Sequence, residues 1–211
     1  MTVQRAAERF LTEGAGWVGR YCFSYGEHYD SGNVSFGHLV ACNEFIVQPG
    51  DGFEDHHHGG IEVVTWVLEG TLLHDGRDRV GRGALQVLST GTGIEHSEVN
   101  PGPDPLRMLQ MWLVPADGGE PRHSLVPAPV QFGVVEVPLR QPGAALHAGP
   151  LVSGQVVDLP RAPFVFVFVA DGTVTVGGHE LGAGDSARLT EPLRAEARSD
   201  ARLLVWAMSA D

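Results

Sequence analysis

Cysteine is scarce in this sequence, which has only Cys22 and Cys42 among its 211 residues. Because the two cysteines do not form a CxxC pair, neither a disulfide framework nor a zinc site made of thiolates is indicated. So few, unpaired cysteines are typical of a protein kept in a reducing compartment. We therefore expect the protein to work in the cytoplasm.

Long apolar runs are also missing. Residues 1–14 carry four charged side chains among the apolar ones, which leaves no uninterrupted apolar core for a signal peptide. No later stretch reaches the roughly 20 apolar residues that a membrane span requires. We expect neither secretion nor a contact with the membrane.

Positive charge is in the minority, because 14 Lys and Arg stand against 26 Asp and Glu, a formal net charge of −12. A surface with this balance repels phosphate backbones over most of its area. Direct binding of nucleic acid is therefore not expected.

Glycine and proline are plentiful, with 28 and 14 residues, and they separate many short apolar runs. This pattern is typical of sandwiches and barrels of antiparallel strands, so we predict an all-β protein. The strands are expected at Phe36–Val47, Ile61–Leu68, Thr71–His74, Ala84–Leu88, Leu106–Val114, Val156–Leu159, Phe164–Val169, Thr173–Val176, Ala187–Leu189 and Ala201–Met208. A short accessory helix is possible at Val3–Leu11, since its apolar residues could share one face.

The segment Pro115–Val130 has four prolines, two adjacent glycines and no apolar period, which indicates a linker or a long crossing loop. We therefore predict an N-terminal domain at 1–118, a linker at 119–130 and a C-terminal domain at 131–211.

The two halves of the sequence repeat each other. The run from Trp66 through Gly70 has a counterpart from Phe168 through Gly172, each consisting of a strand, a turn glycine and a second strand. A repeat at this spacing predicts the duplication of one barrel.

Two pairs of potential metal ligands stand out. His56 and His58 are two residues apart, as are His96 and Glu98, so in extended strands each pair leaves one face of its strand. Brought together inside a barrel, the pairs would present three imidazoles and one carboxylate to a single transition-metal ion. Either pair alone would be read as solvent-exposed, but both occur beside glycine turns that allow the backbone to approach the site closely.

The repeat provides an internal control. Shifting by the separation between Gly70 and Gly172 places Asp158 and Pro160 where the first barrel has His56 and His58. Proline cannot bind a metal, so we expect a metal site only in the N-terminal barrel.

Glu62 is a second candidate for the carboxylate ligand of the metal. Seven residues separate it from Gly70, one more than the usual six, and one extra residue turns a side chain to the opposite face of a regular strand. We therefore assign the carboxylate ligand to Glu98 and a supporting role to Glu62.

The residues just described resemble the pirin family of bicupins. The resemblance runs through most of the N-terminal half, including Pro49–Phe53, His56–His58, Glu62–Gly70, Gly91–Glu98 and Leu109–Trp112. It implies two tandem cupin barrels of the double-stranded β-helix or jelly-roll type, with one iron-like ion held by His56, His58, His96 and Glu98. The chain departs from the family pattern at His57, where the family usually has proline, and at Gly59-Gly60, which replaces a more basic stretch.

Bacterial relatives resemble quercetinases, which open a flavonol ring with dioxygen. The resemblance therefore implies a quercetin 2,3-dioxygenase type of enzyme with a small phenolic or enolic substrate and O2 as reactants. Fe(II) is the favoured ion, although a site of three histidines and one glutamate also accepts Mn, Ni, Cu, Co or Zn. Glu98 would leave the metal and act as the general base, and Phe36, Phe53, Met108 and Trp112 are candidates for the lining of the site.

Two other functions remain open. The human namesake of the family implies a non-catalytic, iron-dependent protein that reports redox state to a protein partner. A cupin of the germin or isomerase type, acting on an organic acid or a sugar, is less favoured because those families normally use the glutamate that is displaced here at Glu62.

Overall fold

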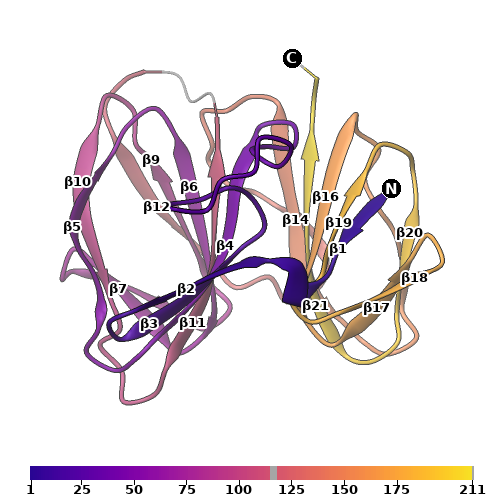
Figure 1. The fold of residues 1–211 in the computed structure, drawn as a ribbon, viewed down its shortest axis with the longest axis horizontal. Helices are drawn as coiled ribbons and strands as arrows, with labels where there is room; N and C mark the ends of the chain where they lie inside the picture. The colour runs from indigo at the N-terminus through magenta and orange to yellow at the C-terminus, as the bar shows by residue number, and fades with distance from the viewer. Residues whose placement is uncertain (115–117, 211) are drawn as a thin grey trace.

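The computed structural model describes residues 1–114 and 118–210. These residues fold into two β-barrels that lie side by side, one from each half of the sequence (Figure 1). Each barrel pairs a larger antiparallel sheet with a smaller one. The predicted all-β fold of two tandem barrels is therefore confirmed.

The N-terminal barrel consists of a seven-stranded and a four-stranded sheet. The larger sheet contains, in hydrogen-bonded order, β12 (Arg122–Val126), β9 (Leu85–Ser89), β6 (Glu62–Glu69), β11 (Leu106–Leu113), β4 (Leu39–Val47), β3 (Trp17–Tyr21) and β2 (Phe10–Gly14). The smaller sheet contains β5 (Gly52–His58), β10 (Ile94–Val99), β7 (Thr71–His74) and β8 (Asp78–Gly81).

The C-terminal barrel consists of a six-stranded and a four-stranded sheet. The larger one contains β1 (Thr2–Gln4), β19 (Ser186–Leu189), β16 (Phe164–Asp171), β21 (Ala201–Met208), β14 (Ala144–Leu151) and β13 (Gly133–Val135). The smaller one contains β15 (Val156–Asp158), β20 (Arg194–Ala197), β17 (Thr173–Val176) and β18 (His179–Gly182).

The hairpin between β7 and β8 shows why the strands end where they do. Both central residues of its turn, Asp75 and Gly76, have a positive φ, of 50° and 63°. Two such residues form the tight turn whose twist matches the right-handed twist of the flanking strands. The turn brings His74 opposite Asp78 across the hairpin.

The helix predicted at Val3–Leu11 is wrong. The segment forms β1, a single 3-10 turn η1 (Ala6–Glu8) and the start of β2. Tertiary contacts override the local pattern, because β1 pairs with β19 of the C-terminal barrel and the carboxylate of Asp185 accepts hydrogen bonds from the backbone N–H of Ala6 and the guanidinium of Arg5.

Each barrel therefore contains a strand from outside the sequence range predicted for it. The first strand joins the C-terminal barrel, which Figure 1 shows as an indigo arrow beside β19. Residues 122–126 of the predicted linker form β12, which pairs with β9 at the edge of the N-terminal barrel. Residues 115–117 of the predicted crossing segment lie outside the described residues. The division at 118 and 130 remains a prediction.

The largest apolar core lies between the two barrels. The outer faces of the two larger sheets pack against each other, with Trp66, Leu109 and Met111 from one barrel meeting Phe166 and Trp206 from the other. Two further apolar clusters fill the barrel interiors. The barrels thus share a common core, which fixes their relative position.

An ionic network crosses the same interface. Arg107 of β11 binds the carboxylate of Glu44 at 2.7 Å and that of Asp171, in the C-terminal barrel, at 2.6 Å. Glu44 also binds Arg9 at 2.7 Å, and both side chains of this pair are less than a tenth exposed. Burial alone would raise the pKa of Glu44, but Arg9 and Arg107 outweigh it and hold that pKa below its ordinary value of 4.5.

Replacing Glu44 with alanine should destabilise the protein by roughly 3 kcal/mol, because Arg9 is then left buried without its carboxylate. Urea denaturation measures this change. Glu69→Ala is the control, since that carboxylate is 56% exposed and 4.0 Å from Arg107, and it should change stability by less than about 1 kcal/mol. Equal losses in both variants would contradict the buried network.

The same network predicts a pH dependence. Because the folded-state pKa of Glu44 is lowered, its stabilisation is present above pH 4.5 and is lost as the pH falls through the lower, folded-state pKa. The unfolding free energy of the wild type should therefore fall more steeply below this pH than that of Glu44→Ala. Parallel pH profiles for the two proteins would show that Glu44 does not carry the effect.

Candidate metal centre

Strands β5 and β10 bring the two predicted donor pairs together. They are antiparallel neighbours, with His56 directly opposite His96, and the register shifts between His96 and Glu98 so that Glu98 lies opposite Phe53. Side chains alternate along β5 as predicted, because His56 and His58 are partly buried while His57 between them is exposed. His96 and Glu98 are each 1% exposed.

Three imidazoles converge at this place. Each of His56, His58 and His96 offers a ring nitrogen, and these nitrogens all lie within 4.8 Å of one another. The distances between the ring centroids range from 4.4 to 5.2 Å. Glu98 does not belong to this three-residue cluster, but its carboxylate lines the same cavity.

The hydrogen bonds of two rings determine which nitrogens remain free. Nδ1 of His56 lies 2.7 Å from the carbonyl of Glu54, and because a carbonyl only accepts, Nδ1 must carry the hydrogen. Nε2 of His56 is then free to bind a metal. Nδ1 of His96 bonds Nε2 of His74 at 3.1 Å, which leaves Nε2 of His96 as the free nitrogen.

Two of the atoms that could bind a metal are buried and unpaired among the described residues. Nε2 of His96 and Oε1 of Glu98 are both inaccessible and make no hydrogen bond to the residues that the structure describes. Such groups are costly unless a ligand or an ion satisfies them. Two buried, unsatisfied donors beside two further imidazoles therefore fit a divalent transition metal.

Burial also keeps two of the imidazoles neutral. It lowers the pKa of His96 to about 3, helped by the neighbouring His56, His74 and His58. Burial, with His56 and His57 as further causes, lowers the pKa of His58 to about 4. At neutral pH both rings hold the lone pair that a metal requires.

Gln110 holds Glu98 in position. Trp112 donates its indole N–H to Oε1 of Gln110 at 3.1 Å, and because indole can only donate, the amide of Gln110 must present its NH2 group on the other side. That NH2 group donates to Oε2 of Glu98 at 2.9 Å. Burial raises the pKa of Glu98, against the opposing effect of this hydrogen bond. Oε1 is thus the free oxygen.

A row of polar side chains crosses the larger sheet on both sides of Gln110. Asn43 and Thr65 flank Gln110 on the neighbouring strands β4 and β6, and Gln86 lies opposite Thr65 on β9. Their side-chain polar atoms are buried and make no hydrogen bond to the described residues. Ordered water usually satisfies such groups in proteins, so the barrel is polar behind Glu98.

A cavity of about 430 Å³ opens beside the donors. Aromatic side chains form much of its wall, together with the donors themselves, and the lining residues include Trp17, Tyr25, Phe45, Phe53 and Trp112. The prediction that Phe53 and Trp112 line the site is therefore confirmed. Burial raises the pKa of Tyr25 to about 12, with Tyr21 and Glu98 as lesser causes, so this hydroxyl stays protonated.

Two other predicted lining residues lie elsewhere. Phe36 packs edge-on against Phe164 of the C-terminal barrel, and Met108 is fully buried in the apolar cluster of the N-terminal barrel. The prediction was wrong for these two because apolar side chains have the same pattern in a core as in a binding site.

Glu62 faces away from the centre. It shares its face of β6 with Val64 and Trp66, which belong to the core between the barrels, whereas Val67 faces the barrel interior. Its carboxylate accepts hydrogen bonds from the hydroxyl of Ser89 at 2.5 Å and from the backbone of Arg140 at 3.2 Å. The extra residue before Gly70 therefore has the predicted effect on the direction of the side chain.

Sequence reasoning missed three residues of the site, namely Gln110, His74 and Tyr25. Gln110 was detectable, since it lies two residues from Trp112 and strand alternation places both on one face. His74 and Tyr25 gave no such signal, because only the pairing of β7 with β10 and the loop before β4 bring them close.

Comparison with known proteins shows which family the chain resembles. The family model "Pirin" matches residues 3–113, and the model "Quercetinase C-terminal cupin domain" matches residues 138–208. A relative from Mycobacterium tuberculosis, provisionally named a quercetin 2,3-dioxygenase, is 36% identical over 236 residues, covering 99% of this chain and 95% of the relative. The quercetin 2,3-dioxygenase of Escherichia coli K12 is 36% identical over 115 residues, covering 51% of this chain and 50% of the enzyme.

Solved structures agree with the sequence comparisons. The bacterial pirin YhhW of Escherichia coli in complex with nickel(II) superposes with a TM-score of 0.93 and 27% identity, covering 98% of each chain. The relative's nickel and the histidine cluster described above together indicate a divalent metal for this site. With one family model covering more than half of its length, and a 36% identical relative covering almost all of it, this chain belongs to the pirin family, whose two barrels are both cupin domains.

Proposed function

We propose that the protein is a metal-dependent quercetin 2,3-dioxygenase that uses O2 to cleave a flavonol or a related phenolic or enolic substrate. The observation that carries the proposal is the buried Oε1 of Glu98, unpaired among the described residues, in the wall of an aromatic cavity beside three clustered imidazoles. The names of the two relatives in M. tuberculosis and E. coli support the same reaction class.

His56, His58, His96 and Glu98 are the proposed ligands of one divalent ion, for which Fe(II) is our first choice. Bound there, the ion would supply a Lewis acid that orients substrate and oxygen. The protein's own contribution is to keep His58 and His96 neutral and to fix the tautomers of His56 and His96. The carbonyl of Glu54 does this for His56, and the ring of His74 does it for His96.

Glu98 is the proposed general base. Gln110 occupies its Oε2, so once Glu98 has left the ion the hydroxyl proton of a flavonol would pass to Oε1, which has no other hydrogen-bond partner among the described residues. A carboxyl with a raised pKa accepts such a proton more readily than an exposed carboxylate does. The aromatic wall would pack on the flat rings of the substrate and exclude water from them.

The compartment proposed for this activity is the cytoplasm. Both cysteines are free thiols, fully buried, and the backbone N–H of Cys22 donates to the carbonyl of Cys42. Two unpaired thiols on neighbouring segments fit a reducing environment. No helix among the described residues has the length and apolar content that crossing a membrane would need.

His58→Ala should lose the tightly bound ion of this centre while the protein stays folded, because one of three imidazoles is lost from the centre. Metal analysis of purified protein and circular dichroism measure the two properties. His179→Ala, which removes an exposed histidine of the C-terminal barrel, should keep its metal. Undiminished metal in His58→Ala would rule out this centre.

Gln110→Leu should weaken metal binding by about 10- to 100-fold, since Glu98 loses the donor that positions it. Competition with a chelator measures the change. Gln86→Leu is the matched control, because it makes the same substitution in the same barrel at an amide that makes no hydrogen bond to the described residues, and its metal affinity should be unchanged. Equal effects of the two substitutions would mean that Gln110 has no positioning role.

The iron- or manganese-loaded protein should consume oxygen when quercetin is added, and Glu98→Ala should consume at least 100-fold less at equal metal content, because the base is absent. An oxygen electrode and metal analysis provide both values. Equal turnover of wild type and Glu98→Ala would remove Glu98 as the base. A fully loaded wild type that is inactive towards flavonols and catechols would favour the non-catalytic, redox-reporting function instead.

A further inference from the structure

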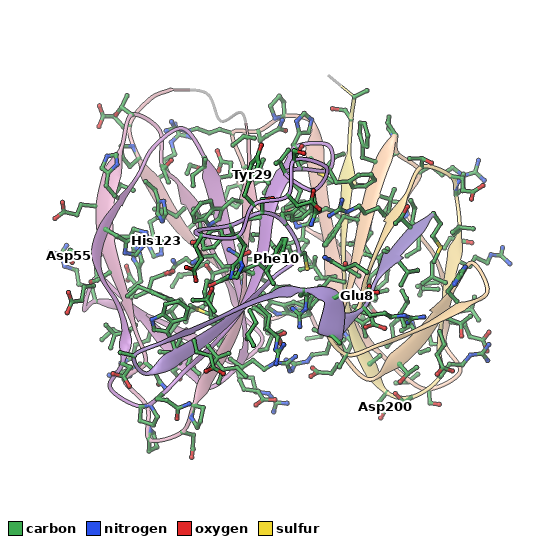
Figure 2. All side chains as sticks on the ribbon, viewed as in Figure 1. Glu8, Phe10, Tyr29, Asp55, His123 and Asp200 are labelled. Carbon is green, nitrogen blue, oxygen red and sulfur yellow. The ribbon has the colours of Figure 1, made fainter. Side chains whose placement is uncertain are left out.

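A second cluster of potential metal ligands lies where the two sheets of the N-terminal barrel meet. His74 ends β7 and Asp78 begins β8, at the edge of the smaller sheet, while His123 belongs to β12, at the edge of the larger sheet. Figure 2 shows His123 within the N-terminal barrel. The proposed reaction uses neither Asp78 nor His123.

The three side chains are close enough to share an ion. Each offers one ligand atom, and these atoms all lie within 4.8 Å of one another. Nδ1 of His123 is 3.3 Å from Oδ2 of Asp78. The rings of His74 and His123 are stacked, with centroids 4.5 Å apart and planes 18° from parallel.

Unsatisfied nitrogens provide independent support for a ligand at this cluster. Nδ1 of His74 and Nε2 of His123 are buried and make no hydrogen bond to any described residue. His74 as a whole is only 2% exposed, so bulk water does not satisfy its nitrogen. A purely structural seam between two sheets would be better served by apolar side chains or by fully paired polar ones.

We propose that His74, Asp78 and His123 form a second site for a divalent cation, coupled to the first. Two imidazoles and a carboxylate suit Zn²⁺ and its neighbours in the transition series. The ring of His123 must turn out of its stack to direct a lone pair at the ion. It has room to do so, because it lies on an edge strand with its side chain 22% exposed. This rearrangement makes the second site weaker than the first.

The coupling follows from one shared hydrogen. Nδ1 of His96 and Nε2 of His74 are hydrogen-bonded to each other, so only one of these two nitrogens can carry a hydrogen. When Nε2 of His96 binds the first ion, its Nδ1 carries that hydrogen, so a neutral His74 must carry its own hydrogen on Nδ1. When Nδ1 of His74 binds the second ion, the hydrogen belongs to Nε2 of His74, and a neutral His96 must carry its own on Nε2.

Each site therefore requires the tautomer that the other forbids. An ion in one site must weaken the binding of an ion in the other, and by thermodynamic linkage the weakening is mutual. The coupling rests on His96 as a ligand of the first centre, but it does not depend on any activity towards flavonols.

Zn²⁺ titration of the metal-free, full-length protein tests this proposal. Isothermal calorimetry should show one tight equivalent and a second that binds at least ten-fold more weakly. The double variant His56→Ala, His58→Ala should lose the tight equivalent and keep the other. That remaining ion should bind at least three-fold more tightly than the second ion of the wild type. The reason is that His96 no longer binds the first ion and no longer imposes on His74 the tautomer that excludes the second.

Asp78→Asn and His123→Ala should each remove the weak equivalent and keep the tight one. His179→Ala, which removes an exposed histidine elsewhere, should keep both. Asp78→Asn retains the shape of a half-exposed side chain, so it stays informative if His123→Ala does not fold. A weak equivalent that survives Asp78→Asn, or a double variant that binds no zinc, would overturn the second site.

Nitrogen-15 NMR of the imidazole rings tests the coupling directly. Filling the first site should place the ring hydrogen of His74 on Nδ1, and zinc added to the double variant should move it to Nε2. An unchanged tautomer of His74 in the two states, or a second ion that binds equally well in wild type and double variant, would disprove the antagonism. None of these measurements uses substrate turnover, so they can fail or succeed independently of the proposed dioxygenase activity.

Discussion

The pairing of β5 with β10 is the constraint on which the rest of the site depends. In this register His56 lies opposite His96, and a slip by one residue would replace the partly buried ring of His56 with the exposed His57. The irregularity between His96 and Glu98 shifts the pairing of Glu98 to Phe53. Such irregularities re-aim side chains next to functional sites. Here the carboxylate reaches Gln110 on the opposite sheet.

The two barrels share an architecture but differ in what they enclose. The C-terminal barrel is filled by an apolar cluster that includes Val167, Val174 and Leu203. The interior of the N-terminal barrel combines an apolar cluster with buried amides, imidazoles and a carboxylate, and several of these groups have no hydrogen-bond partner within the described part of the chain. Because such groups lower stability, their concentration in one barrel is a mark of function there. At the repeat position of His56, Asp158 is 79% exposed and binds Arg194.

Packing between the barrels supports the site from behind. Strands β6 and β11 turn alternate residues to the shared core and to the barrel interior, so Leu109 and Met111 anchor the same strand that presents Gln110 and Trp112 to the cavity. The network around Glu44 and Arg107 spans the same interface. The C-terminal barrel therefore holds β11, the strand whose Gln110 positions Glu98. In this way the apolar barrel has a structural role in the site.

The sequence by itself determined about half of the strands, the duplication and the alternation within the two donor pairs, because strand alternation and turn chemistry are local properties that a chain carries in its residue order. The direction of the Glu62 side chain, away from the metal centre, followed from the same alternation. Only the tertiary structure decided that β1 belongs to the second barrel and that β12 completes the first. It also decided that Phe36 and Met108 are core residues and that His74 and His123 meet beside His96. These facts depend on which strands become neighbours, and that choice rests on burial across the whole chain rather than on any local pattern.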